Sequence, residues 1–242
     1  MNEVGRSTPK RIDPRVLRRW VSVLFASVPD LTVGHAMHGL AQRCAAEGEF
    51  GLVVRIFFSM SEHRIRLRKR ASWVEDAQEG EEAEVSAELD FRSNHWTLND
   101  VWTKHLKPRI SELAPRLLDH ATARLRSIRS DLRPWNVSSD EWDSMSFRRS
   151  AIEPHEQDRY PDAEDILIDV GRDTVEWLAA ARPADASSWI EANRSPEVPL
   201  LRRIAIHAVS IHSQMDADLR IAWLLDKVGL QGLAEHHEVF RL

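Results

Sequence analysis

The stretch ISELAPRLLDHATARLRSIRSDL, residues 110–132, places an apolar residue every three or four positions. That spacing puts the apolar side chains on one face of a helix. Only Pro115 interrupts the pattern, and a proline near the start of a helix can kink or break it. The stretch therefore predicts one long amphipathic helix, whose apolar face is formed by Ile110, Leu113, Leu117, Ala121, Leu125, Ile128 and Leu132.

The same spacing recurs on both sides of this stretch. Because the connections are short, neighbouring helices are expected to run antiparallel. Two segments, 13–20 and 195–204, also read alike: each opens on a proline, continues with aliphatic residues and carries paired arginines. The sequence predicts an all-α fold, a degenerate helical-repeat (HEAT-like) array of antiparallel helices. Further helices are expected at about 14–29, 33–46, 49–60, 97–108, 162–181, 187–193, 199–211, 216–228 and 234–242.

Between about residues 64 and 91 the apolar period changes from three or four to two, which is the period of a strand. Residues 64–70 alternate apolar and cationic side chains, and residues 84–91 alternate apolar and anionic or polar ones. We expect a small β-hairpin whose charged faces pair at about 0.2–1 kcal/mol per pair. Its tip would be an acidic loop at 75–82, and the facing charges would be Arg64, Arg66 and Arg68 against Glu84, Glu88 and Asp90.

These patterns divide the chain into four parts. Residues 1–10 are expected to form a flexible tail, 11–63 the N-terminal helices, 64–95 the hairpin with its acidic loop, and 96–242 a C-terminal helical array. A connection at 134–161 is polar and contains prolines, with one turn of helix expected around 141–144. The apolar pattern stops in mid-turn at Leu242, whereas a free C-terminus is usually polar. We therefore expect either that the chain is a fragment of a longer protein, with the array truncated there, or that a partner covers its end.

Composition excludes several classes of protein. The 242 residues include a single cysteine, which excludes a disulfide scaffold and multi-cysteine metal sites. The net charge of −5 provides no overall attraction for nucleic acid. The sequence contains no phosphate-binding glycine loop, no apolar run of membrane-spanning length and no secretory signal. We expect a cytoplasmic protein.

Two charged features suggest binding. Asp162, Asp165, Asp169, Asp173 and Glu176 are three or four residues apart, so they share one helical face. This acidic stripe could hold a hard cation, but a solvated face, or one docked against arginines, is the preferred interpretation.

The second feature is a basic segment at 104–133, which contains eight Lys and Arg residues. It is the best local argument for contact with nucleic acid. Its cations could equally pair with the acidic stripe or with the acidic loop. Aromatic residues that could stack on bases are absent from 109–133.

Candidates for catalysis and metal binding are weak. The histidine pairs lack spaced third and fourth ligands, and Cys44 lies among apolar positions like a small buried hydrophobe. The loop 153–160 holds a histidine, carboxylates and the only tyrosine, yet it also fits a connection that caps the next helix. No catalytic, cofactor-binding or metal-binding residue is predicted. The histidine pairs considered are His35 with His38, His207 with His212, and His236 with His237.

The tryptophans fall into two groups. Those on apolar helix faces are predicted to lie in the core, and those near connections are predicted to be docking anchors. The first group comprises Trp20, Trp102, Trp177 and Trp223, and the second comprises Trp73, Trp96 and Trp135.

Several short sequence segments within residues 50–242 together resemble a known family. They are Ser72-Trp73 before the acidic loop, Asn94-His95-Trp96-Thr97-Leu98 ahead of Trp102 and Leu106-Lys107-Pro108, Arg149-Ser150-Ala151-Ile152-Glu153-Pro154-His155-Glu156-Gln157-Asp158, and His237-Glu238-Val239-Phe240-Arg241-Leu242. The region resembles the C-terminal helical domain of unknown function in sirtuin-like NADase proteins of bacterial anti-phage defence. The resemblance implies a sensing or scaffolding array. A parent protein could carry the NADase domain, but no NAD-handling motif of that domain is present here.

The leading hypothesis is a non-catalytic interaction, scaffold or sensor module of a larger bacterial defence protein. Its partner would be another protein or the remainder of a longer chain, because stacked helix pairs present extended surfaces. One alternative is a nucleic-acid-binding accessory domain that uses the basic segment. A second is a stand-alone enzyme with a site around 153–160. No cofactor is predicted and no membrane is expected as a partner.

Overall fold

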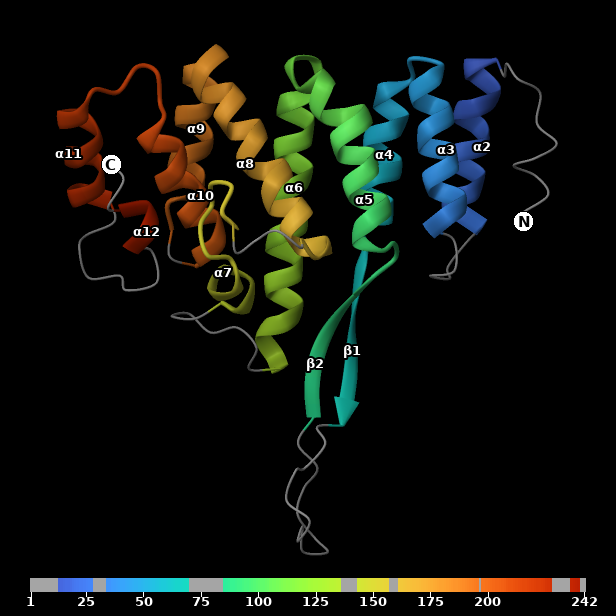
Figure 1. The fold of residues 1–242 in the computed structure, drawn as a ribbon, viewed down its shortest axis with the longest axis horizontal. Coiled ribbons are helices and arrows are strands. Elements are labelled where there is room, and N and C mark those ends of the chain that lie inside the picture. Colours follow the sequence, from blue (N-terminus) through green and yellow to red (C-terminus); the bar gives the residue numbers. More distant parts are fainter. Residues whose placement is uncertain are drawn as a thin grey trace, which may run out of the picture.

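The computed structural model describes residues 13–27, 34–69, 85–135, 143–156, 161–195, 197–227 and 236–239. Within these ranges the fold is helical, with one two-stranded antiparallel sheet. This confirms the predicted all-α class with a small hairpin. The helices stand side by side along the longest axis of the molecule, with α2 at one end and α11 at the other (Figure 1). The expected tail, the acidic loop, Glu84, Trp73 and the last three residues lie outside the described residues.

The first three helices match the three predicted ones: α2 (Pro14–Ser27), α3 (Gly34–Ala46) and α4 (Phe50–Met60). The side chain of Asp13 accepts a hydrogen bond from the backbone N–H of Arg15 at 2.7 Å, which caps the start of α2. The turn between α3 and α4 is made at Gly48, whose φ of 75° is left-handed. Glycine adopts that conformation without steric cost.

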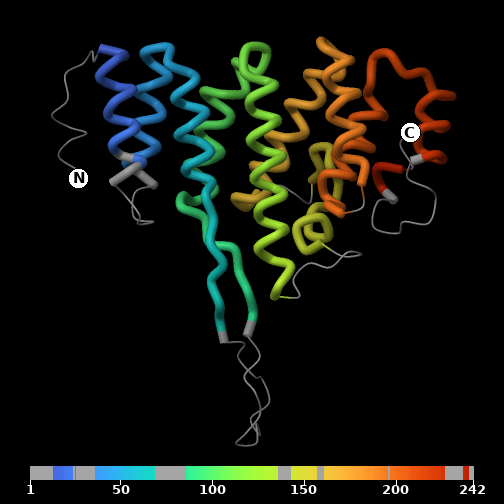
Figure 2. Tube along the Cα trace, turned by 180° about the vertical axis from the view of Figure 1, so that it is seen from behind, coloured from blue at the N-terminus to red at the C-terminus, as the bar shows by residue number. Residues whose placement is uncertain are grey.

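The hairpin consists of β1 (His63–Lys69) and β2 (Val85–Phe91), paired antiparallel with Ile65 opposite Leu89. It extends beyond the ends of the helices (Figures 1 and 2). The predicted pairing of opposite charges is confirmed for the described residues: Arg64 and Arg66 both reach Asp90, and Arg68 reaches Glu88. At the root of the hairpin, the His63 ring is 2.9 Å from a carboxylate oxygen of Asp131 on α6.

Next come α5 (His95–Val101) and α6 (Ile110–Leu132), which run antiparallel (Figure 1). They are joined by a π-helical turn (Trp102–Leu106) and a 3₁₀ turn (Lys107–Arg109), and a second 3₁₀ turn (Arg133–Trp135) follows α6. The helix α6 runs through Pro115 without a break. The long helix predicted over 110–132 is therefore confirmed, with no break at Pro115.

The C-terminal elements are α7 (Ser144–Arg148), α8 (Ala163–Ala181), α9 (Pro183–Asn193), α10 (Pro199–Ser210), α11 (Ala217–Lys227) and α12 (His236–Val239). Two boundaries differ from the predictions. The single turn expected at 141–144 begins at Ser144, because the side chain of Asp143 caps it by accepting the N–H of Met145. The helix α9 begins four residues before the expected 187, since Pro183 supplies a favourable first position.

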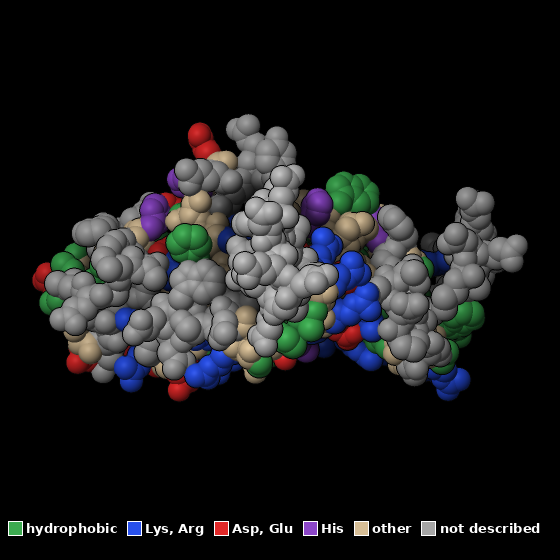
Figure 3. Space-filling view, turned by 90° about the horizontal axis from the view of Figure 1, so that it is seen from below, with side chains coloured by type: hydrophobic (Ala, Val, Ile, Leu, Met, Phe, Trp, Pro, Cys, Tyr) green, Lys and Arg blue, Asp and Glu red, His purple; other side chains and the backbone are tan. Residues whose placement is uncertain are grey.

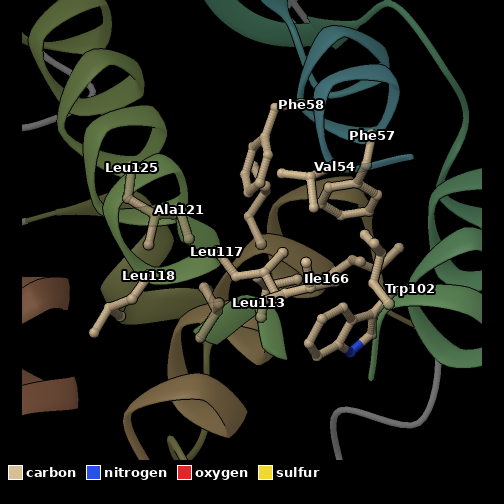
Figure 4. Packing of buried hydrophobic residues seen from close by; sticks show 14 of the residues in the cluster. Val54, Phe57, Phe58, Trp102, Leu113, Leu117, Leu118, Ala121, Leu125 and Ile166 are labelled. Atoms are coloured by element: carbon tan, nitrogen blue, oxygen red, sulfur yellow. The ribbon is translucent and has the colours of Figure 1, made fainter. Parts of the chain in front are cut away.

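One hydrophobic core runs along the array from α2 to α10. At its centre, Phe57 and Phe58 of α4 face Leu117 of α6, with Ile166 of α8 nearby (Figure 4). Of the tryptophans predicted as core, Trp102 is buried, and Trp177 and Trp223 are half-buried. The prediction for Trp20 is wrong: α2 is the end of the array, so no further described helix covers that face. No described helix is both long and apolar enough to cross a membrane.

Candidate functional site

The acidic stripe on α8 is docked against cations within the chain. Arg149 Nη2 lies 2.6 Å from Asp169 Oδ1, and Arg172 donates to Asp169 and Asp173 at 2.7 and 2.6 Å. Lys107, from the turn before α6, lies 2.7 Å from Asp173. In the described part of the chain, no group of three or more His, Cys, Asp or Glu side chains is placed to hold a metal ion. The interpretation of the stripe as a docked face is confirmed.

Burial changes the pKa of two carboxyl groups on α8, Asp169 in the acidic stripe and Glu164 beside it. Burial raises the pKa of Asp169 above its usual range, although Arg172 and Arg149 act in the opposite direction. Burial likewise raises the pKa of Glu164, against the opposing charge of Arg148. These carboxylates are held inside the fold by arginines, which is typical of structural ion pairs rather than of a ligand site.

A second buried ion pair attaches α12 to the rest of the chain. Arg203 on α10 donates two hydrogen bonds to the Glu238 carboxylate, at 3.0 Å from Nε and 2.8 Å from Nη2. The Glu238 carboxylate also accepts the backbone N–H of Ile152 at 3.1 Å. Arg203 further donates to the backbone oxygens of Ser146 and Arg149. Two-pronged pairs of this kind fix geometry strongly, so four segments meet at one guanidinium group.

Most cations of the basic segment already have partners within the chain. Arg124 donates to the backbone oxygen of Phe58 and Arg126 to the side chain of Asn193, both at 2.9 Å. The guanidinium of Arg109 lies 4.9 Å from the centre of the Phe50 ring. Ion pairs join three more to carboxylates: Lys104 to Asp100, Lys107 to Asp173, and Arg129 to Asp143.

The described histidines of the predicted pairs each contact a different partner. His38 lies 2.9 Å from Asp100, His207 lies 2.7 Å from Glu176, and His237 lies 2.9 Å from Glu153. The side chains of His35 and His236 lie outside the described residues. None of these contacts brings two histidines of a predicted pair onto one site.

Cys44 is buried, and burial raises the pKa of its thiol to about 11. Its thiolate is therefore scarce at neutral pH, and the side chain behaves as the small hydrophobe that was predicted.

Only part of the candidate loop 153–160 lies among the described residues. Glu153 contacts His237 at 2.9 Å, and residues 157–160, including the only tyrosine, lie outside the described residues.

One serine–histidine pair escaped the sequence analysis. Ser187 Oγ lies 3.0 Å from His212 Nε2, which also lies 3.1 Å from the backbone oxygen of Pro183. The backbone N–H of Gln214 donates to Nδ1 of the same ring. The ring proton therefore sits on Nε2, which donates to the serine instead of accepting its proton. The pair ties α9 to the segment after α10 and is not arranged for nucleophilic catalysis.

A cleft of about 670 Å³ opens at the root of the hairpin. Ser93 on its wall is buried, and its hydroxyl has no hydrogen-bond partner among the described residues. Arg148 lies on another wall, where its guanidinium group forms an ion pair with Asp162 and a second one, at 2.7 Å, with Glu164. The volume lies within the range of ligand-binding clefts. The walls are formed by Ala87–Phe91 of β2, 93–95, Leu132 at the end of α6, Ser144, Met145 and Arg148 of α7, and 162–164 at the start of α8.

Sequence reasoning did not find this cleft because its walls come from four segments that are far apart in the chain. One signal was available: the helix-capping residues Asn94, Asp143 and Asp162 begin three helices whose first turns meet here. The sequence alone does not indicate that the N-termini of these three helices lie close together in the fold. The packing of α8 on α5 and α6, and of α10 on α7 and α8, brings them to one place.

Comparison of the chain with protein-family models, with curated proteins and with solved structures finds no match.

Proposed function

We propose that this chain is a non-catalytic interaction module whose cleft holds an extended segment of a partner protein. The observation that carries the proposal is that Ala87–Phe91, five consecutive residues of β2, line the cleft, whereas no residue of β1 does. The cleft therefore follows the edge of β2 that faces away from β1. Among the described residues, β2 has no strand partner on that edge. Extended peptides add to such edges through backbone hydrogen bonds.

The other walls support an extended occupant. Side chains of a bound strand alternate between two sides, and the cleft offers both apolar and polar contacts. Leu132 and Met145 belong to the apolar part of the walls, and Asn94 and Arg148 provide exposed polar groups. A segment of alternating apolar and polar residues therefore fits these walls best.

The wider setting belongs to the same proposal. The resemblance of residues 50–242 supports a sensor or scaffold role within a larger bacterial anti-phage defence protein, in the cytoplasm. In that setting the bound segment would belong to a protein trigger or to another part of the longer chain.

Nucleic-acid binding through 104–133 is the weaker alternative, because Arg124, Arg126 and Arg129 are engaged within the chain. A salt titration separates the two functions. Binding to phosphates weakens steeply with salt, whereas strand addition depends on it only slightly.

The experiment is a display selection of random peptides against the full chain. A Ser144→Trp variant fills the cleft, and Ser111→Trp adds the same side chain to an exposed position at the far end of α6. We expect the selected peptides to bind the wild type and Ser111→Trp equally and Ser144→Trp at least about tenfold more weakly. Bound peptide should slow amide exchange over 87–91. Peptides that bind all three proteins equally and leave β2 unprotected would exclude the proposal.

A further inference from the structure

The first helix of the array exposes an apolar stripe. Val16, Trp20 and Val23 are 43%, 45% and 59% exposed. Their spacing of four and three residues puts them on one face of α2, while Leu17 and Val21 on another face are buried in the core. The stripe therefore points away from the array at its N-terminal end.

The last long helix has the same property at the opposite end. On α11, Ile221 and Leu225 are about half exposed and lie one turn apart on the same face, which we call the α11 stripe, whereas Leu219 is half exposed on a different face and Leu224 is buried. Among the described residues, six of the eleven large hydrophobic side chains that are exposed lie on α2 and α11. Soluble proteins rarely concentrate exposed apolar side chains without a binding role.

The two stripes carry opposite charges. Arg15 and Arg19 are exposed on α2, next to Val16 and Trp20. Asp218 is exposed on α11, one turn before Ile221. Seen from below, hydrophobic side chains are exposed at both ends of the long axis, with cationic side chains beside them at the α2 end (Figure 3). Complementary charges favour contact between the two ends and disfavour contact between two like ends.

We propose that copies of this chain associate head to tail, the α2 stripe of one copy seated on the α11 stripe of the next. The helices α2 and α11 lie at opposite ends of the longest axis (Figures 1 and 2). Two copies joined in this way therefore still have one free α2 stripe and one free α11 stripe between them. Such a contact between two different surfaces extends into a filament or closes into a ring. The cleft takes no part in it, so this association is independent of the proposed peptide binding.

The test uses two blocked variants of the full chain. Trp20→Asp removes the α2 stripe, and Leu225→Asp removes the α11 stripe. We expect the wild-type mass in light scattering to grow with concentration beyond that of a dimer and to fall when salt screens the charges. Each variant alone should remain a monomer. An equimolar mixture of the two should form a dimer and nothing larger, because each variant retains one competent stripe.

Matched controls carry the same substitutions at exposed positions away from both ends. Trp135→Asp and Leu67→Asp replace side chains that are 44% and 48% exposed. Both should associate as the wild type does. A wild type that stays monomeric at every concentration would overturn the proposal, as would a Trp20→Asp protein that still dimerises alone through α11. The first result would indicate that the chain itself covers the stripes, and the second a symmetric contact.

Discussion

The two halves of the array bury different chemistry. In α2–α4, the buried side chains are almost all apolar, including a nearly continuous run from Leu52 to Met60. In α7–α12, the interior also holds buried charges, among them Arg149, Arg172, Arg203 and Glu238. Apolar burial is non-directional, whereas a buried charge must meet a partner in a set geometry. The difference indicates that the C-terminal half is ordered by specific contacts and the N-terminal half by shape and area.

The sharpest way to test this comparison is to remove one partner of a buried pair. In an Arg203→Met variant, the Glu238 carboxylate loses its charge partner, and the backbone oxygens of Ser146 and Arg149 lose a donor. We expect the free energy of unfolding to fall by about 3–5 kcal/mol. Urea denaturation of the wild type and the variant measures the difference.

A surface pair supplies the control. Arg18 is 60% exposed where it meets Glu49, so Arg18→Met should change stability far less than Arg203→Met does, because solvent screens an exposed ion pair. A double variant, Arg203→Met with Glu238→Met, should recover much of the loss because no charge is left unpaired. Equal small losses for Arg203→Met and Arg18→Met would contradict the idea that the C-terminal half depends on its buried charges.

The matching change in the N-terminal half is Phe57→Ala. Phe57 is fully buried on α4 and packs edge-on against Phe58 (Figure 4). We expect a loss of about 3–5 kcal/mol, from lost apolar burial and the cavity that remains. The more conservative Phe57→Leu should lose clearly less, since it refills part of that space. A loss for Phe57→Leu as large as that for Phe57→Ala would indicate that shape does not govern this half.

The same contrast explains which parts of the fold could be predicted from the sequence. Helix periodicity reports which face is apolar, so the helices α2, α3, α4, α6 and α10 could be predicted to within a few residues. It does not report what covers that face. Trp20 has the spacing of a core residue, yet it lies at the end of the array.

The candidate site was harder to predict, because it depends on contacts between distant segments. The acidic stripe of α8 could be read from spacing alone, and docking against arginines was the preferred interpretation. Its actual partners include Arg149, from a connection with no periodic signal, and Lys107. The cleft likewise joins β2 to the start of α8, more than 70 residues apart in the sequence printed here. Packing, which periodicity cannot report, brings these segments together.

The halves should also differ in their response to pH. Burial lowers the pKa of His63, at the hairpin root, and of His105, in the turn after α5. Because the folded pKa of each lies below the unfolded value, the unfolded chain binds more protons as pH falls through about 6.5. We expect the free energy of unfolding to fall over that range. A His63→Gln, His105→Gln variant should lose this slope in urea titrations at several pH values.

Glu164, in the C-terminal half, contributes with the opposite sign. Its folded pKa is raised by burial, so the folded chain binds more protons between the ordinary and the raised value. Its contribution to stability therefore increases as pH falls through that window, and Glu164→Gln should remove it. A Glu164→Gln protein with an unchanged slope at acidic pH, or a histidine variant that retains the slope near pH 6.5, would contradict the assignment.

The smallest expected effects come from two glycines, one in each half. At Gly48 the φ of 75° favours glycine, and an added Cβ would meet nothing within 4 Å. Gly48→Ala should therefore lose about 1 kcal/mol through backbone strain alone. Gly171 lies within α8, where an added Cβ would be 3.7 Å from the Ile204 side chain, an ordinary contact. Gly171→Ala should gain about 0.5–1 kcal/mol from helix propensity. If Gly171→Ala instead loses stability, the packing of α8 on α10 is tighter than that contact indicates.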